Sequence, residues 1–164
     1  MGAGSRVSTV IVRSLDEAQA VLTLAAAVER RDIRLTSPPS VGLASPPSVG
    51  RTLGIGFMAG LIRAAGAPPE AWIIDCGPHA GDALAACRLG LGRIAVDLPA
   101  DDPRRAALAD IARQSGQSLV DPPVGAFDFS AASRSQADPL AACRAWLYTP
   151  ACPVDAHPEE GPKR

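Results

Sequence analysis

The segment Trp72-Ile73-Ile74-Asp75 is apolar up to its last residue, and a cysteine and a Gly-Pro pair follow it directly. A short apolar run without alternation of polar residues is typical of a strand buried on both faces. Such strands belong mainly to parallel sheets whose faces are covered by helices. This segment therefore restricts the chain to α/β folds more strongly than any other stretch.

The rest of the chain alternates in the same way between short β-branched segments and longer amphipathic ones. Strands are expected at residues 7–13, 33–36, 71–75, 93–98 and 118–120, with an edge strand or loop at 127–129. Helices are expected at residues 14–31, 51–65, 82–89, 103–114 and 139–148. This order predicts βαβ units and a mostly parallel sheet of about five strands. An open, three-layer sheet of the Rossmann or flavodoxin type is favoured, and half of a (β/α)8 barrel is the alternative.

Length and composition indicate one domain with an aliphatic core. The chain has 164 residues, of which 47% are hydrophobic and only 4% aromatic. A chain of this length can bury a sufficient core without disulfides or a metal. We expect a single α/β domain at residues 1–149, followed by a Pro-rich, charged and flexible tail at 150–164.

Charge and hydropathy exclude several classes of partner. The formal net charge is −1, and lysines and arginines do not cluster in a basic stripe. This argues against nucleic-acid binding, which depends on clustered positive charge. No apolar run reaches the ~20 residues of a membrane span, and no signal peptide is recognisable. The expectation is a cytoplasmic protein whose four cysteines are reduced thiols.

An eight-residue unit occurs twice in succession, at residues 35–42 and 43–50. The two copies read Leu-Thr-Ser-Pro-Pro-Ser-Val-Gly and Leu-Ala-Ser-Pro-Pro-Ser-Val-Gly. Two copies are too few for a repeat architecture, so a tandem duplication inside a loop at 36–50 is the preferred interpretation. A polyproline motif for a protein partner is the alternative, although the Pro-x-x-Pro spacing with flanking basic residues is absent.

Three glycines, Gly54, Gly56 and Gly60, lie within the expected helix at 51–65. Their spacing does not match the dinucleotide-binding fingerprint, and no strand leads directly into them. We expect them instead to allow this helix to approach the sheet closely.

Ligands of parallel α/β sheets bind at the carboxyl ends of the strands. The turn from Gly77 to Gly81 precedes a helix and could direct backbone N–H groups at an anion. The acidic residues Asp75, Asp82 and Asp97 oppose an anion, and Arg51 is the best-placed cation. The candidate ligand-binding residues are Ser37, Ser40, Arg51, Gly77, Gly81 and Asp97.

Catalysis is a weaker hypothesis, and its candidates are Asp75, Cys76 and His79. Cys76 lies near glycine and a helix N-terminus, a setting that lowers a thiol pKa, and His79 could act as its base. A third orienting group is not identifiable. Asp75 could be a general acid or base, or a cation ligand, at a strand end. The sequence leaves open whether the chain is an enzyme.

No cofactor is expected, with zinc as the alternative. Cys76-x-x-His79 has ligand-like spacing, and Cys152 and His157 could complete a tetrahedral Cys2His2 site. Such a site would connect the C-terminal tail to the central loop.

The Leu35-Thr-Ser-Pro-Pro motif, the run Ile74-Asp75-Cys76-Gly77 and the following Gly81 resemble a set of small bacterial α/β proteins without an assigned activity. The resemblance covers roughly residues 30–100. His79 and the doubled Ser-Pro-Pro unit depart from the pattern. The resemblance implies the α/β fold and a shared ligand edge, and it implies no activity.

Two functions remain as predictions. The first is binding of a small molecule, with anions among the candidates, at the carboxyl ends of the strands. The second is a non-catalytic assembly or interaction subunit, completed by a second copy of the chain or by a protein partner.

Overall fold

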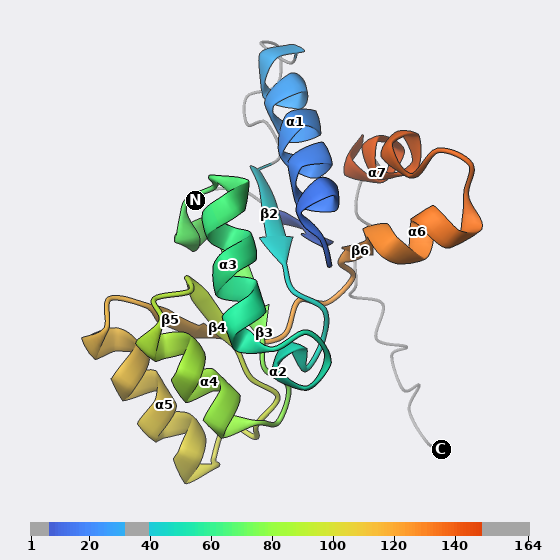
Figure 1. Cartoon of the computed structure of the whole chain (residues 1–164). Helices are drawn as coiled ribbons and strands as arrows, with labels where there is room; N and C mark the ends of the chain where they lie inside the picture. Colours follow the sequence, from blue (N-terminus) through green and yellow to red (C-terminus); the bar gives the residue numbers. More distant parts are fainter. Residues whose placement is uncertain (1–6, 32–39, 149–164) are drawn as a thin grey trace, which may run out of the picture.

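The computed structural model describes residues 7–31 and 40–148, and it shows a six-stranded, all-parallel sheet with helices between the strands (Figure 1). The strands are β1 (Val7–Ile11), β2 (Ser40–Ala44), β3 (Trp72–Asp75), β4 (Arg93–Ala95), β5 (Ser118–Val120) and β6 (Phe127–Asp128). The helices are α1 (Leu15–Arg31), α2 (Val49–Thr52), α3 (Ile55–Ala65), α4 (Ala80–Arg88), α5 (Pro103–Gln114), α6 (Phe129–Ser135) and α7 (Pro139–Tyr148), with a 3-10 turn, η1, at Pro69–Ala71. The α/β class and the parallel sheet are confirmed.

The strand order is β5-β4-β3-β2-β1-β6. Strands β1 to β5 are successive neighbours, as in half of a (β/α)8 barrel. Strand β6 returns to the free side of β1, which is the single reversal of order found in open doubly wound sheets. The strand order thus combines one feature of each architecture expected from the sequence.

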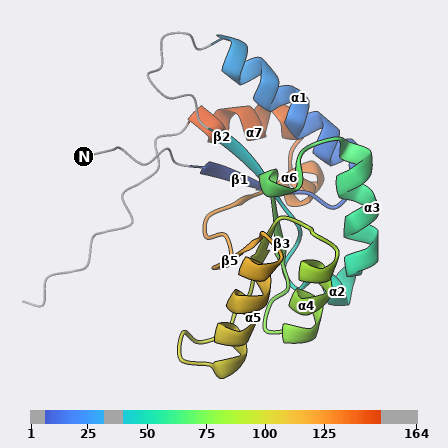
Figure 2. The same cartoon turned by 90° about the vertical axis from the view of Figure 1, so that its left-hand side faces the viewer.

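One face of the sheet packs against the helices and forms the main core. Alternate strand residues such as Leu43, Trp72, Ile74 and Ile94 join buried side chains of α1, α3, α4 and α5 in one apolar cluster. The opposite face carries a separate, small cluster that contains no helical residue: Ala44, Ile73 and Ala95, with Ile11 and Val120 against them. In Figure 2 the helices accordingly form an arc around one side of the strands.

The sheet is curled, and the β5–β6 connection requires this. In a flat sheet, five strand spacings of ~4.8 Å separate β5 from β6, a distance of ~24 Å. The connection comprises residues 121–126, which would have to be fully extended to span that distance. It instead contains a turn with Gly125 at φ 69°. The two edges of the sheet must therefore bend toward each other around the helix-free face.

Several boundaries differ from those expected from the sequence. Strand β2 begins at Ser40 inside the duplicated segment that was expected to be a loop, and the expected strand at 33–36 lies outside the described residues. The expected helix at 51–65 is two helices, because Gly54 at φ 89° interrupts it. Helix α6 was missed, although Asp128 caps it by accepting a hydrogen bond from the Ala131 N–H at 2.9 Å.

The glycines of α3 do not serve the role expected of them. A Cβ added at Gly56 or Gly60 would have no neighbour within 4 Å, and both residues are exposed. They therefore lie on the outer side of α3, and the expectation that they allow close approach to the sheet is wrong. No helix in the described part of the chain is long and apolar enough to cross a membrane.

Candidate functional site

The carboxyl end of β3 is organised by the carboxylate of Asp75, which is buried at 6% exposure. Its Oδ1 accepts hydrogen bonds from the Gly77 N–H at 2.8 Å and from the Ser48 N–H at 3.5 Å. Its own backbone N–H donates to Ser45 Oγ at 2.9 Å. Asp75 thus connects the loop after β2 to the loop after β3. Within the described part of the chain, its second oxygen, Oδ2, accepts no hydrogen bond.

The two residues whose N–H groups donate to Asp75 both have backbone angles in the left-handed region. Ser48 has φ 51° and is the sole non-glycine residue with positive φ among those described, and Gly77 has φ 55°. A Cβ on Gly77 would collide with Ser48 Oγ, so only glycine fits at this position. A left-handed serine costs of order 1–3 kcal/mol, and such strain occurs preferentially at binding and catalytic sites.

Asp82, in the first turn of α4, approaches the same loop from the other side. Its carboxylate lies directly against Gly50, where a Cβ would overlap it. Its Oδ2 is buried and has no hydrogen-bond partner among the described residues. Two carboxylates therefore converge on Ser48-Val49-Gly50, which gives this edge of the sheet a negative character.

Cys76 does not have the properties expected of a nucleophile. Its side chain is 0% exposed and belongs to the core cluster on the helical side of the sheet. Burial, together with the smaller effect of the nearby carboxylates of Asp82 and Asp75, raises the thiol pKa to about 12. The expectation that this setting lowers the thiol pKa is wrong, because the apolar core and the two acids outweigh the helix N-terminus.

His79 occupies the N-cap position of α4 and is half-buried, but its side chain makes no capping hydrogen bond. Its backbone N–H donates to the Cys76 carbonyl at 3.2 Å. The Cys76 thiol instead contacts the Ile74 carbonyl at 3.7 Å, so no thiol–imidazole pair forms between the described side chains. The geometry does not support catalysis by Cys76 and His79.

The other expected ligand residues are distributed unevenly. Asp97 follows β4 at the carboxyl edge, is exposed, and donates its backbone N–H to the Gly77 carbonyl at 2.9 Å. Arg51 and Gly81 are exposed in the first turns of α2 and α4, at the same edge. Ser40 is the first residue of β2, at the amino end, so its expected place at the carboxyl edge is wrong. Ser37 lies outside the described residues.

A metal site is not assembled by the described residues. No three of their His, Cys, Asp and Glu side chains lie close enough together to hold a metal ion. Cys152 and His157 are not among the described residues, so the zinc alternative stays a prediction.

The sequence placed Asp82 at this acidic edge, but it did not single out Ser45 and Ser48, which lie with Asp82 around Asp75. Ser45 and Ser48 belong to the second copy of the duplicated unit, which follows the strand that the sequence placed eight residues earlier. Ending that strand in the second copy would have singled out both serines within the loop at 37–48 expected at this edge.

A second polar network joins the end of β1 to its neighbour β6. The Arg13 guanidinium donates to both oxygens of Asp128, at 2.5 and 2.9 Å. Glu17 accepts from the Arg13 N–H at 2.6 Å and from Ser130 Oγ at 2.6 Å. Because every charged group here has a partner, this network is structural rather than open to a ligand.

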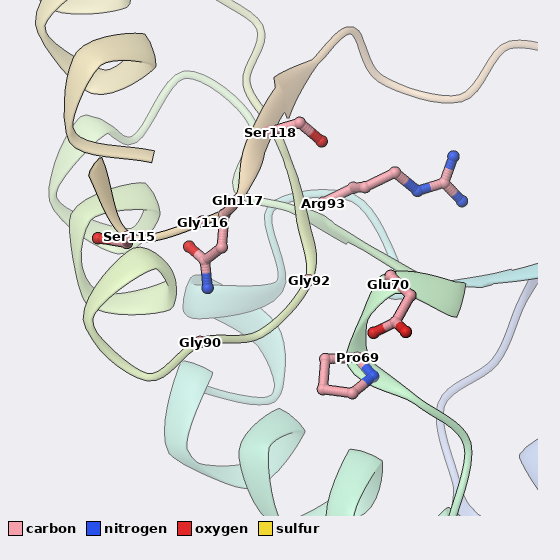
Figure 3. Close-up of a pocket in the computed structure, with 9 residues that line it drawn as sticks. All are labelled: Pro69, Glu70, Gly90, Gly92, Arg93, Ser115, Gly116, Gln117 and Ser118. Carbon is pink, nitrogen blue, oxygen red and sulfur yellow. The ribbon is translucent and has the colours of Figure 1, made fainter. Parts of the chain in front are cut away.

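Two hollows lie at the opposite, amino-terminal end of the strands. One has a volume of about 350 Å³ and is shown in Figure 3, with Gly90, Gly92, Arg93, Gln117 and Ser118 in its wall. There the Arg93 side chain extends away from Gln117. When its amide is oriented to satisfy its neighbours, Gln117 accepts the Leu91 N–H at 3.0 Å. The Gln117 amide in this wall is therefore already occupied by hydrogen bonds to the turn between α4 and β4.

The other hollow, of about 430 Å³, is lined by Ile62, Arg63, residues 66–69 and residues 89–91. Both hollows lie away from the carboxyl edge. A pocket at that edge, expected from the sequence, stays a prediction.

The chain matches no protein-family model, and neither a curated protein nor a solved structure shows significant similarity to it. The resemblance to small bacterial α/β proteins accordingly stays a prediction.

Proposed function

We propose that this chain binds a small polar ligand at the carboxyl edge between β2 and β3, with Asp75 as the central acceptor. The observation that carries the proposal is the Asp75 carboxylate. It is nine-tenths buried, one oxygen is held by two backbone N–H groups, and the other accepts no hydrogen bond from the described residues. Asp75 Oδ2 is not one of the buried atoms that lack a partner, so it retains access to solvent and can accept a hydrogen bond from a ligand.

The charges at this edge favour a ligand with hydroxyl or amino donors over an anion. Asp75, Asp82 and Asp97 all lie at or beside the loops after β3 and β4. Arg51 is exposed on the adjoining α2 and is the cation nearest in sequence to Ser48. The left-handed Ser48 and Gly77 support the proposal further, because they hold two loops in positions that local preference alone would not produce.

The test is a titration of the ¹⁵N-labelled chain followed by NMR, with ethanolamine, D-ribose and orthophosphate as separate probes. We expect ethanolamine or ribose to shift the amide signals of Ser48, Gly77 and Asp75 in a saturable manner. Asp75→Asn should abolish the response, because the amide introduces donors where an acceptor is needed. Asp110→Asn, on the exposed face of α5, is the matched control.

A response to orthophosphate alone would contradict the donor chemistry and restore the anionic ligand. Absence of a saturable response to all three probes, with the folded spectrum intact, would contradict the proposal. Native mass spectrometry of the purified chain gives an independent reading, since a retained ligand appears as a mass increment that Asp75→Asn lacks.

A further inference from the structure

The second copy of the duplicated unit, residues 43–50, occupies the end of β2, the following loop and the start of α2. The same Ser-Val-Gly tripeptide is extended strand at residues 40–42 and a left-handed turn into a helix at residues 48–50. Identical sequence thus has two structures in one chain. The unit does not determine its own conformation, and its neighbours in the fold do.

Four positions of the second copy depend on their side chains or on the lack of one. Leu43 and Val49 are 1% and 0% exposed in the core, Ser45 Oγ accepts the Asp75 N–H, and Gly50 leaves space for Asp82. Eight residues earlier, the first copy has the same residue at each position: Leu35, Val41, Ser37 and Gly42. The segment also makes backbone ladder bonds with β1 and β3, which any residue except proline can make.

We propose that β2 has two registers, eight residues apart, and that the first copy can take the place of the second. In the second register, residues 32–36 pair with β1 in place of Ser40–Ala44, and residues 37–42 form the loop and the start of α2. The expected strand at 33–36 is then the strand of this register. The inference does not depend on the proposed ligand.

Helix α1 can supply the chain length that this slip requires. It has 17 residues, whereas α3, α4 and α5 on the same face have 11, 9 and 12. Among its side chains described, through Ala27, the last fully buried one is Leu24. The α5–β5 connection needs only residues 115–117. Unwinding the last turn of α1 would therefore provide a sufficient connection to a strand that begins at Asp32.

Two substitutions make the second register the less stable one. Thr36 replaces Ala44, which is 0% exposed between Ile11 and Ile73, so the slip buries a hydroxyl and an extra methyl group. Arg34 replaces Gly42, which is buried opposite Thr9. These differences favour the register seen in the structure and leave the other as a minor state.

The slip changes the position of eight residues relative to β2 in the chain. In the present register the extra residues precede β2. In the second register they lie between α2 and α3, at the carboxyl edge beside Asp75. Exchange between the registers would thus lengthen the loop next to the candidate site.

Two deletion variants provide references for the test. Deleting residues 43–50 leaves only the first copy, so Thr36 must occupy the strand, whereas deleting residues 35–42 retains Ala44. Both variants should fold. The amide shifts of Ile11 and Ile73, the neighbours of Ala44 in the ladder, then report which copy is in place.

Saturation-transfer NMR on the full ¹⁵N-labelled chain should detect a minor state at Ile11 and Ile73. Its shifts should match those of the variant lacking 43–50 and differ from those of the variant lacking 35–42. Thr36→Ala should raise its population roughly tenfold by removing the buried hydroxyl. Leu35→Asp should remove it without lowering the thermal midpoint of the full chain.

Failure of the variant lacking 43–50 to fold would overturn the inference, since the first copy would then be unable to form β2. A full chain without a minor state in wild type and in Thr36→Ala would overturn it equally. A minor state that persists in Leu35→Asp would show an exchange other than the slip and would also overturn it.

Discussion

Arg13 and Asp128 lie 115 residues apart in the sequence and form a two-bond ion pair that joins the end of β1 to β6. Their side chains are 32% and 31% exposed, so the pair is partly buried. Strand β6 has only two residues in the ladder. The ion pair is thus a main attachment of the last strand and of α6 to the sheet.

Arg13→Met should lower the free energy of unfolding by ~1–2 kcal/mol at pH 7, because it removes two charge-assisted hydrogen bonds. The hydrogen bonds from Arg13 hold the pKa of Asp128 below its ordinary value. A lowered pKa contributes stability that is present above the unfolded-state pKa, near pH 4, and is lost as the pH falls through the folded-state pKa.

Urea unfolding measured between pH 7 and pH 2.5 tests this prediction. The difference between wild type and Arg13→Met should be constant above pH 5 and should shrink below pH 4. Arg113→Met removes an exposed pair with Asp110 and should change stability by less than ~0.5 kcal/mol. Equal effects of the two substitutions would contradict a special role for Arg13.

Gly77→Ala should destabilise the chain by ~2 kcal/mol or more, because the residue has φ 55° and its new Cβ would collide with Ser48 Oγ. Gly81→Ala is the matched control, since it lies in α4 and its Cβ would have no neighbour within 4 Å. That control should stabilise by ~0.5–1 kcal/mol through helix propensity. Thermal denaturation by circular dichroism distinguishes the two, and a neutral Gly77→Ala would show that the loop is not constrained.

Ser45→Ala should cost ~1–3 kcal/mol, because it leaves the buried Asp75 N–H without its acceptor. Ser133→Ala removes an exposed hydroxyl that donates to the Phe129 carbonyl within α6 and should be nearly neutral. Chemical denaturation supplies both values. Faster amide exchange at Asp75 in Ser45→Ala would connect the loss to this hydrogen bond, and unchanged exchange would refute the assignment.

Cys76 should not react with Ellman's reagent in the folded chain at pH 8. With a pKa of about 12, only about one thiol in 10⁴ is ionised at that pH, and the side chain is 0% exposed. Labelling of a Cys152→Ser variant, followed by mass spectrometry of its peptides, should show modification of Cys76 only under denaturing conditions. Rapid labelling of Cys76 in the folded chain would restore the thiol to the catalytic candidates.

Much of the fold is predictable because the relevant signals are local. The apolar run Trp72–Asp75 indicates a buried parallel strand, and Asp102-Pro103 indicates the start of α5, where Asp102 accepts the Arg104 N–H at 2.8 Å. Asp75, Gly77 and Asp97 are predictable site residues for the same reason, since each follows or ends a recognisable strand.

The environment of the site could not be predicted, because it depends on contacts between distant segments. Ser48 and Asp82 meet the β3 loop only after β2 is placed beside β3. Cys76 looked like a reactive thiol near a helix N-terminus, but its orientation toward the core decided its pKa. The direction of a side chain at a strand end depends on strand register, which local sequence does not contain.

The sequence by itself determined the class of fold, the positions of most helices and the strand–turn–helix unit from Trp72 to Arg88. These follow from hydrophobic periodicity and from capping residues, which act within a few positions of the chain. Only the tertiary structure decided in which register the duplicated segment forms β2, and thus why the same Ser-Val-Gly is strand in one copy and turn in the other. That choice depends on burying Ala44 rather than Thr36 and Gly42 rather than Arg34, and those costs exist only once the sheet is assembled.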